Sequence, residues 1–228
     1  AKKPEGNGRG PVMLVITPTR ELAQQIDEVA SKIADVTGHV AVTVVGGVSY
    51  KPQTAALKYG CDILVATPGR LVDLIEQGAC HLDEVKVLVL DEPMAGLDPA
   101  ARGDFLGLID RLHREGLTVV MVSHSMDDLA NCCDRIVVMN EGAVFAEGTP
   151  AQVFAHADEL KSIGLGVPAA QRMALALAKA GVPLRCDRLY TVEALADELA
   201  GLLLGCADGL LRVPRQAGSK APTREEGC

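Results

Sequence analysis

The sequence contains no tryptophan, and only 3% of its residues are aromatic. A hydrophobic content of 48% is nevertheless ordinary for a folded globular chain, so alanine, valine and leucine must fill the interior. The longest apolar runs stay far below the roughly 18 residues that suggest a membrane-spanning helix, and no secretory signal pattern opens the chain. We therefore expect a folded chain with neither a span nor a signal peptide.

The seven cysteines include no C-x-x-C pair. Their odd number fits free thiols in a reducing compartment, which favours the cytoplasm. Cys132 and Cys133 are adjacent within an expected helix, where a buried thiol is favoured over a metal site. The net charge of −8 argues against strong overall attraction to nucleic acid, although it leaves room for a local basic strip.

Short apolar runs alternate with helical patterns along the chain. The expected strands are Val12–Ile16, Val40–Val45, Ile63–Ala66, Val85–Leu90 and Leu117–Val122. Strands that alternate with helices favour a parallel α/β sheet. Further along, Arg135–Met139 and Ala143–Glu147 flank a tight turn, which predicts a hairpin, and helical segments are expected near Ala169–Ala180 and Val192–Leu204.

The run Val85–Leu90 ends in two adjacent carboxylates, Asp91 and Glu92. Apolar and polar residues do not alternate along this run, which is typical of a parallel strand buried on both faces. Acidic groups at its carboxyl end would face the crevice in which such sheets bind ligands. In nucleotide hydrolases an aspartate here holds Mg²⁺, and a neighbouring carboxylate orients or deprotonates the attacking water. A strand that simply ends in solvated acids explains the pattern equally well.

Residues 11–92 contain four short motifs, which are Pro18-Thr-Arg-Glu-Leu-Ala23, Gly46-Gly47, Thr67-Pro-Gly-Arg70 and Val89-Leu-Asp-Glu92. In this order they resemble the first core domain of a DEAD-box RNA helicase. The resemblance implies that an RNA backbone path is lined by Pro18, Thr19, Arg20, Glu21, Gly46, Gly47, Thr67, Pro68, Gly69 and Arg70. Backbone amides and arginine suit phosphates, which carry no sequence information. The alternative is turn chemistry together with an ion-paired arginine.

Residues 87–204 carry a second set of motifs, which are Leu90-Asp-Glu-Pro-Met-Ala-Gly-Leu-Asp98, Val122-Ser-His-Ser125 and Asp134-Arg-Ile-Val-Val-Met-Asn-Glu-Gly142. These resemble the C-terminal half of an ABC transporter ATPase, and the segment from Leu160 onward resembles the cobalt or energy-coupling-factor importer branch. The resemblance implies ATP and Mg²⁺ as cofactors. It assigns Asp91 to the metal, Glu92 and His124 to catalysis, and Asp98 and Ser123 to the nucleotide. Asp98 also fits a plain helix N-cap.

The two resemblances meet at Val87–Glu92, so we expect a chimera on one RecA-like, P-loop-NTPase-like parallel α/β sheet flanked by helices. The P-loop strand itself is missing, and a small helical C-terminal appendage follows. The expected divisions are a loop at 1–10, a helicase-like half-domain at 11–92, an ABC-ATPase-like half-domain at 93–157 that completes the same sheet, a helical extension at 158–204 and a loosely ordered tail at 205–228.

The phosphate-binding pattern G-x-x-x-x-G-K-[ST] does not occur in the sequence. The transporter signature motif is also absent, so we expect a remnant Mg-ATP site that does not hydrolyse ATP. The alternatives are an ATP-binding subunit of an ABC importer, which would work with membrane subunits, a DEAD-box-like RNA-binding module, and a purely structural chimera. A homodimer, or a partner that supplies the missing fragment, would also fit.

Overall fold

The computed structural model describes residues 9–95, 97–186 and 188–207. The chain divides into two compact units, Ala1–His124 and Ser125–Cys228. The first unit thus contains the four motifs of residues 11–92 and the part of the second set of motifs that ends at His124.

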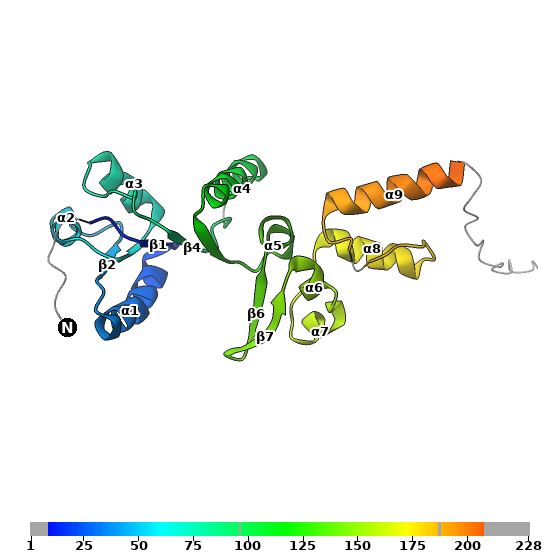
Figure 1. The fold of residues 1–228 in the computed structure, drawn as a ribbon, viewed down its shortest axis with the longest axis horizontal. Coiled ribbons are helices and arrows are strands. Elements are labelled where there is room, and N and C mark those ends of the chain that lie inside the picture. The colour runs from blue at the N-terminus through cyan, green and yellow to red at the C-terminus, as the bar shows by residue number, and fades with distance from the viewer. Residues whose placement is uncertain (1–8, 96, 187, 208–228) are drawn as a thin grey trace, which may run out of the picture. The chain divides into compact units, whose positions relative to one another are not determined.

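The first unit is built on one five-stranded parallel sheet with the order β2-β3-β1-β4-β5 (Figure 1). The strands are β1 (Met13–Ile16), β2 (Ala41–Val44), β3 (Ile63–Ala66), β4 (Val87–Asp91) and β5 (Thr118–Val122). All four neighbouring pairs run parallel. The expected parallel α/β sheet is confirmed, and the carboxyl ends of its strands therefore meet at one edge.

Helices cover both faces of this sheet. They are α1 (Arg20–Thr37), α2 (Tyr50–Tyr59), α3 (Pro68–Glu76) and α4 (Pro99–Arg114). Because side chains alternate along a strand, Val15 packs with Ala23 of α1 on one face, while Leu64 clusters with Leu74 of α3 and Ile109 of α4 on the other. Figure 1 shows α1 and α3 on opposite sides of the strands.

Strand β5 is an edge strand of this sheet. Val119 and Met121 pack against the cluster that includes α4. The alternate residues Val120 and Val122 are 47% and 53% exposed. The face of β5 that carries Val120 and Val122 is thus apolar and partly exposed.

The second unit begins its regular structure with α5 (Met126–Cys132) and a separate antiparallel sheet of β6 (Ile136–Asn140) and β7 (Ala143–Gly148). The expected hairpin is confirmed. Of the strands within residues 93–157, only β5 joins the first sheet, because β6 and β7 pair with each other. Glu141 and Gly142 both have positive φ, 50° and 78°, which suits a two-residue hairpin turn. This turn lets β6 and β7 form backbone hydrogen bonds with each other.

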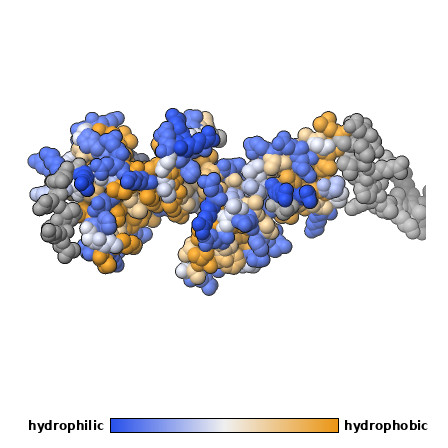
Figure 2. Space-filling view, viewed as in Figure 1, coloured by the Kyte–Doolittle hydropathy of each residue, from blue (hydrophilic) through white to orange (hydrophobic). Residues whose placement is uncertain are grey.

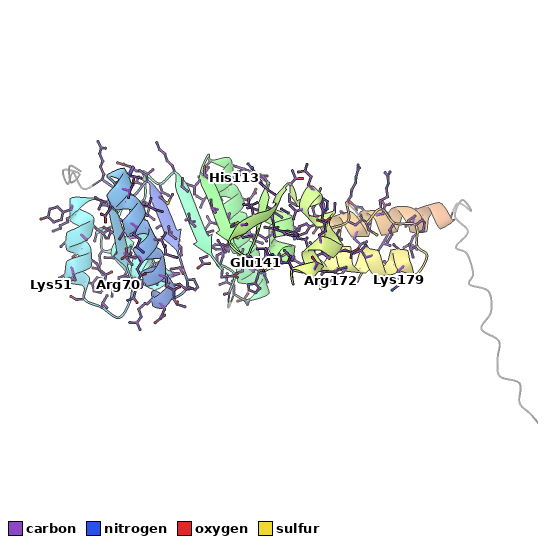
Figure 3. The ribbon with its side chains drawn as sticks, turned by 90° about the horizontal axis from the view of Figure 1, so that it is seen from below. Lys51, Arg70, His113, Glu141, Arg172 and Lys179 are labelled. Atoms are coloured by element: carbon purple, nitrogen blue, oxygen red, sulfur yellow. The ribbon has the colours of Figure 1, made fainter. Side chains whose placement is uncertain are left out.

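The remaining helices of the second unit are α6 (Pro150–Phe154), α7 (Ala157–Ser162), α8 (Ala169–Lys179) and α9 (Val192–Ala207). Helices α8 and α9 lie where helical segments were expected near Ala169–Ala180 and Val192–Leu204. Figure 3 labels Arg172 and Lys179 along α8. Figure 2 shows hydrophobic surface at the far end of α9, where Leu203 and Leu204 are exposed.

The expected tail lies outside the described residues from position 208, as does the expected loop up to position 8. Among the described residues, none of the helices combines the length and the apolar composition that crossing a membrane requires.

Candidate functional site

A surface cavity of about 500 Å³ lies where β1, β2 and β3 end. Its lining residues are Pro18, Thr19, Arg20, Glu21, Gly46, Gly47 and Thr67. These seven positions come from three motifs that are far apart in the sequence but share one edge of the sheet. The groove, as we call this cavity from here on, therefore collects most of the positions expected to contact RNA.

The start of α1 places Arg20 beside the glycine turn. Thr19 caps the helix, and its hydroxyl accepts a hydrogen bond from the N–H of Leu22 at 3.2 Å. Arg20 Nη1 then donates to the carbonyl oxygen of Gly46 at 3.5 Å. Gly47 has φ +76°, and a Cβ there would lie 2.5 Å from Arg20 Nη1. Both the backbone conformation and the space therefore favour glycine at this position.

Thr67 fixes the glycine turn from the side of β3. Its side chain is only 8% exposed, and its hydroxyl accepts a hydrogen bond from the N–H of Gly46 at 3.4 Å. The N–H of Thr67 donates to the carbonyl of Val44 at 3.1 Å, next to the end of β2. The groove is thus held by hydrogen bonds between neighbouring strand ends.

Arg70, expected in the RNA path, is buried at 6% exposure instead and does not line the groove. Its guanidinium carbon lies 4.0 Å from the centroid of the Tyr50 ring, and Nη2 donates to the carbonyl of Val48 at 2.9 Å. Nε and Nη1 have no hydrogen-bond partner among the residues that the structure describes. Pro68 and Gly69, which begin α3, are likewise not among the lining residues.

Sequence reasoning missed Gln53, which clamps the strand that leads into the glycine turn. The side chain is 7% exposed, and its Oε1 accepts from the N–H of Val45 at 3.1 Å. Its Nε2 donates to the carbonyls of Val45 and Ser49, at 3.3 and 3.2 Å. The sequence carries no clear signal for this role, because glutamine is mostly exposed in proteins and the backbone partners that a buried amide needs are brought to it by the fold.

The acidic edge, formed by Asp91, Glu92 and His124, lies at the ends of β4 and β5. Glu92 Oε1 is 2.8 Å from His124 Nδ1 and also accepts the backbone N–H of His124 at 3.0 Å. The N–H of Glu92 donates to the carbonyl of Val122 at 2.9 Å. Thr17, which is fully buried and was not expected in the site, donates to Asp91 Oδ2 at 3.4 Å. The structure thus brings together the two residues expected to be catalytic.

Two expected nucleotide contacts have different surroundings. Asp98 caps α4, and its Oδ1 accepts from the N–H groups of Ala100 and Ala101 at 2.9 and 3.0 Å. This local role explains the residue without a ligand. Ser123 lies between β5 and His124, next to the acidic edge.

The acidic edge does not fit Mg²⁺ by itself. Of its two carboxylates, Glu92 is engaged by His124, which leaves Asp91. Magnesium sites that use one or two carboxylates rely on substrate phosphates for further ligands. The described residues contain no cluster of three His, Cys, Asp or Glu that could hold a metal, and the sequence lacks the phosphate-binding motif. We therefore assign no step to a bound metal.

A parallel sheet with glycine and acidic motifs at its carboxyl edge defines a P-loop-NTPase-like α/β domain. The family model for DEAD/DEAH box helicases matches residues 2–131, which is more than half of the chain. The chain therefore belongs to the DEAD/DEAH box helicase family. The match continues beyond residue 92, across β5 and into α5.

The chain is also related to ABC ATPases. It is 48% identical over 122 residues to the energy-coupling factor transporter ATP-binding protein EcfA2 of Symbiobacterium thermophilum, an alignment that covers 54% of this chain and 42% of that protein. The EcfA2 of Latilactobacillus sakei is 50% identical over 97 residues, which cover 42% of this chain and 33% of the relative. The chain thus spans less than half the length of these relatives, and both expected resemblances are present.

Solved structures of similar chains include DEAD-box proteins. The yeast DEAD-box splicing factor Prp28 is 34% identical, with a TM-score of 0.44 over 51% of this chain and 28% of that one. A hypothetical ATP-dependent RNA helicase from Sulfolobus tokodaii is 27% identical, with a TM-score of 0.44 over 54% of this chain and 38% of that one.

Proposed function

We propose that the first unit is an RNA-binding module that contacts the phosphate backbone of single-stranded RNA through the groove and does not hydrolyse ATP by itself. The observation that carries this proposal is the convergence of seven motif residues, from three strand ends, on one open cavity. Arg20 supplies the positive charge, and the glycine turn allows close approach of a ligand to the backbone.

Contact with phosphates predicts how the affinity for RNA depends on salt concentration. For single strands the logarithm of the association constant falls with the logarithm of salt concentration with a slope of about −0.7 per phosphate contacted. Arg20→Ala should therefore weaken binding and reduce the magnitude of the slope by about 0.7. The matched control is Arg111→Ala, which removes an exposed arginine of α4 on the same unit.

Fluorescence anisotropy with an end-labelled, mixed-sequence RNA measures both quantities. Equal losses for Arg20→Ala and Arg111→Ala would mean that binding follows overall charge and not the groove. No binding by the wild-type chain at low salt would overturn the proposal outright.

The absence of ATP hydrolysis is supported by the missing phosphate-binding motif. Purified protein with Mg-ATP should release phosphate at the rate of a buffer blank. Multiple-turnover hydrolysis that disappears in Glu92→Gln would contradict this part of the proposal, because it would show that the acidic edge is still catalytic.

A second candidate function is ATP binding as part of an energy-coupling-factor importer, in which membrane subunits and a second ATPase copy would be partners. It is favoured by the contact between Glu92 and His124 and by the likeness to EcfA2. Analytical ultracentrifugation with and without ATP tests this function. A dimer that forms only with ATP, and that His124→Ala prevents, would support it. A thermal melt that Mg-ATP does not shift would count against any surviving nucleotide site.

We propose that the chain is a chimera joined near Val87–Glu92, as the two relationships suggest, and that it acts in the cytoplasm. The free thiols of Cys61, Cys80, Cys132, Cys133 and Cys186 support a reducing compartment. Non-reducing mass spectrometry of the protein from intact cells tests this, since paired cysteines would contradict it.

A further inference from the structure

Cys132 and Cys133 are neighbours in the chain, and their sulfur atoms also lie close together, 3.9 Å apart. Cys132 is the last residue of α5, and Cys133 caps that helix with φ −106° and ψ 133°. The backbone leaves its helical path at Cys133, so the second side chain does not continue round the helix. The end of α5 thus presents two thiols as a pair.

The spacing of the two sulfurs fits a bridging atom better than a disulfide. A disulfide bond needs its sulfurs about 2.05 Å apart. Two thiolates that each lie about 2.3 Å from one tetrahedral centre, the distance found for zinc, are about 3.8 Å apart. The observed 3.9 Å therefore suits two ligands of a common atom without a large change in the backbone.

The two thiols are unequal in a way that favours reaction at Cys133. A hydrogen bond between the two thiols lowers the pKa of Cys133 and raises the pKa of Cys132. Cys132 Sγ also lies 2.8 Å from the carbonyl oxygen of Asp128, to which it donates. Both thiols are partly exposed. A reagent can therefore reach a thiolate with a second thiol next to it.

The other described cysteines provide a contrast within the same chain. Cys61 and Cys80 are buried in the core of the first unit, at 5% and 4% exposure. Burial raises the pKa of both thiols, that of Cys61 to about 12. Cys186 is partly exposed, and its sulfur lies 3.8 Å from the carbonyl of Leu184. These thiols serve as internal controls for a reagent that needs two accessible sulfurs.

We propose that Cys132 and Cys133 form a two-thiol binding site for a soft, thiophilic metal or metalloid. A trivalent organoarsenical is the simplest probe, because it keeps its carbon substituent and needs only two sulfur ligands. Phenylarsine oxide reacts with the two thiols to form two As–S bonds, and both S–H bonds break. The oxygen of the arsenical leaves as water with the two protons, and arsenic stays trivalent.

The test uses the full chain, reduced and then treated with phenylarsine oxide in the presence of excess monothiol. Single cysteines lose the arsenical to the monothiol, whereas a chelating pair retains it, and intact-mass spectrometry counts what remains. We expect one retained phenylarsenic group in the wild-type chain. Cys132→Ser and Cys133→Ser should each lose it, while Cys186→Ser and Cys80→Ser should keep it. Addition of dimercaptopropanol should remove it from each chain that had retained it.

Three results would overturn the proposal. They are no retention by the wild-type chain, retention by both Cys132→Ser and Cys133→Ser, and a loss of two mass units without added arsenic that both serine variants abolish, which would indicate a disulfide between these two residues. Circular dichroism of the two serine variants shows whether α5 and its surroundings remain folded. If one variant unfolds, the other still decides, because chelation needs both sulfurs.

Discussion

Replacement of Gly47 by alanine tests whether the glycine turn shapes the groove. The backbone at Gly47 has φ +76°, and the new Cβ would lie 2.5 Å from Arg20 Nη1. The left-handed conformation costs a non-glycine residue roughly 1–2 kcal/mol. The close contact falls on the far end of a flexible side chain, so Arg20 should move away rather than the backbone. We expect a loss of about 1–2 kcal/mol in the free energy of unfolding, together with weaker RNA binding.

The adjacent glycine is the matched control. A Cβ added at Gly46 would meet no atom of the described residues within 4 Å, and the φ of this residue is not positive, so Gly46→Ala should change neither property much. Urea unfolding measures the stability difference, and anisotropy with single-stranded RNA measures the affinity. If Gly47→Ala and Gly46→Ala are equally stable and bind RNA equally well, the glycine turn does not position Arg20 and the reasoning fails.

Three further predictions concern the interior of the first unit. Gln53→Leu should destabilise by about 2 kcal/mol or more, since it leaves buried backbone groups unpaired, whereas exposed Gln25→Leu should be nearly neutral in the same denaturant titration. Leu74→Ala should cost about 2–5 kcal/mol, and Val72→Ala, which alters a side chain 51% exposed, much less. Stability should fall between pH 9.0 and about 12, because the folded state keeps Cys61 protonated in this window; Cys61→Ala should flatten the curve.

Much of the first unit follows from sequence pattern alone. The runs that became β1, β3 and β5 are apolar, of strand length and bounded by turn residues, so their existence and parallel arrangement could be predicted. The tight turn at Glu141 and Gly142 likewise predicted that β6 and β7 pair as a hairpin. The sequence pattern did not show that this hairpin forms a sheet of its own instead of extending the first sheet.

The groove was predictable to the extent that motif residues follow strands of one parallel sheet. Arg70 and Gln53 show where this reasoning ends. Periodicity treats both as polar and places them at the surface, yet both are buried. Their burial depends on partners that are distant or unspecific in sequence, namely the ring of Tyr50 and the backbone of Val45. Such partners become visible only once the loops are placed in space.

Glu92 has φ 47°, a left-handed conformation that is rare for residues other than glycine and asparagine. Its backbone hydrogen bond to Val122 and its side-chain contact with His124 hold it there. Strain of this kind persists only where the surroundings enforce it. The turn after β4 therefore holds backbone strain next to the acidic edge. Glycine at this position would relieve the strain but remove the carboxylate, so a gain in folding stability there would come only with the loss of the contact to His124.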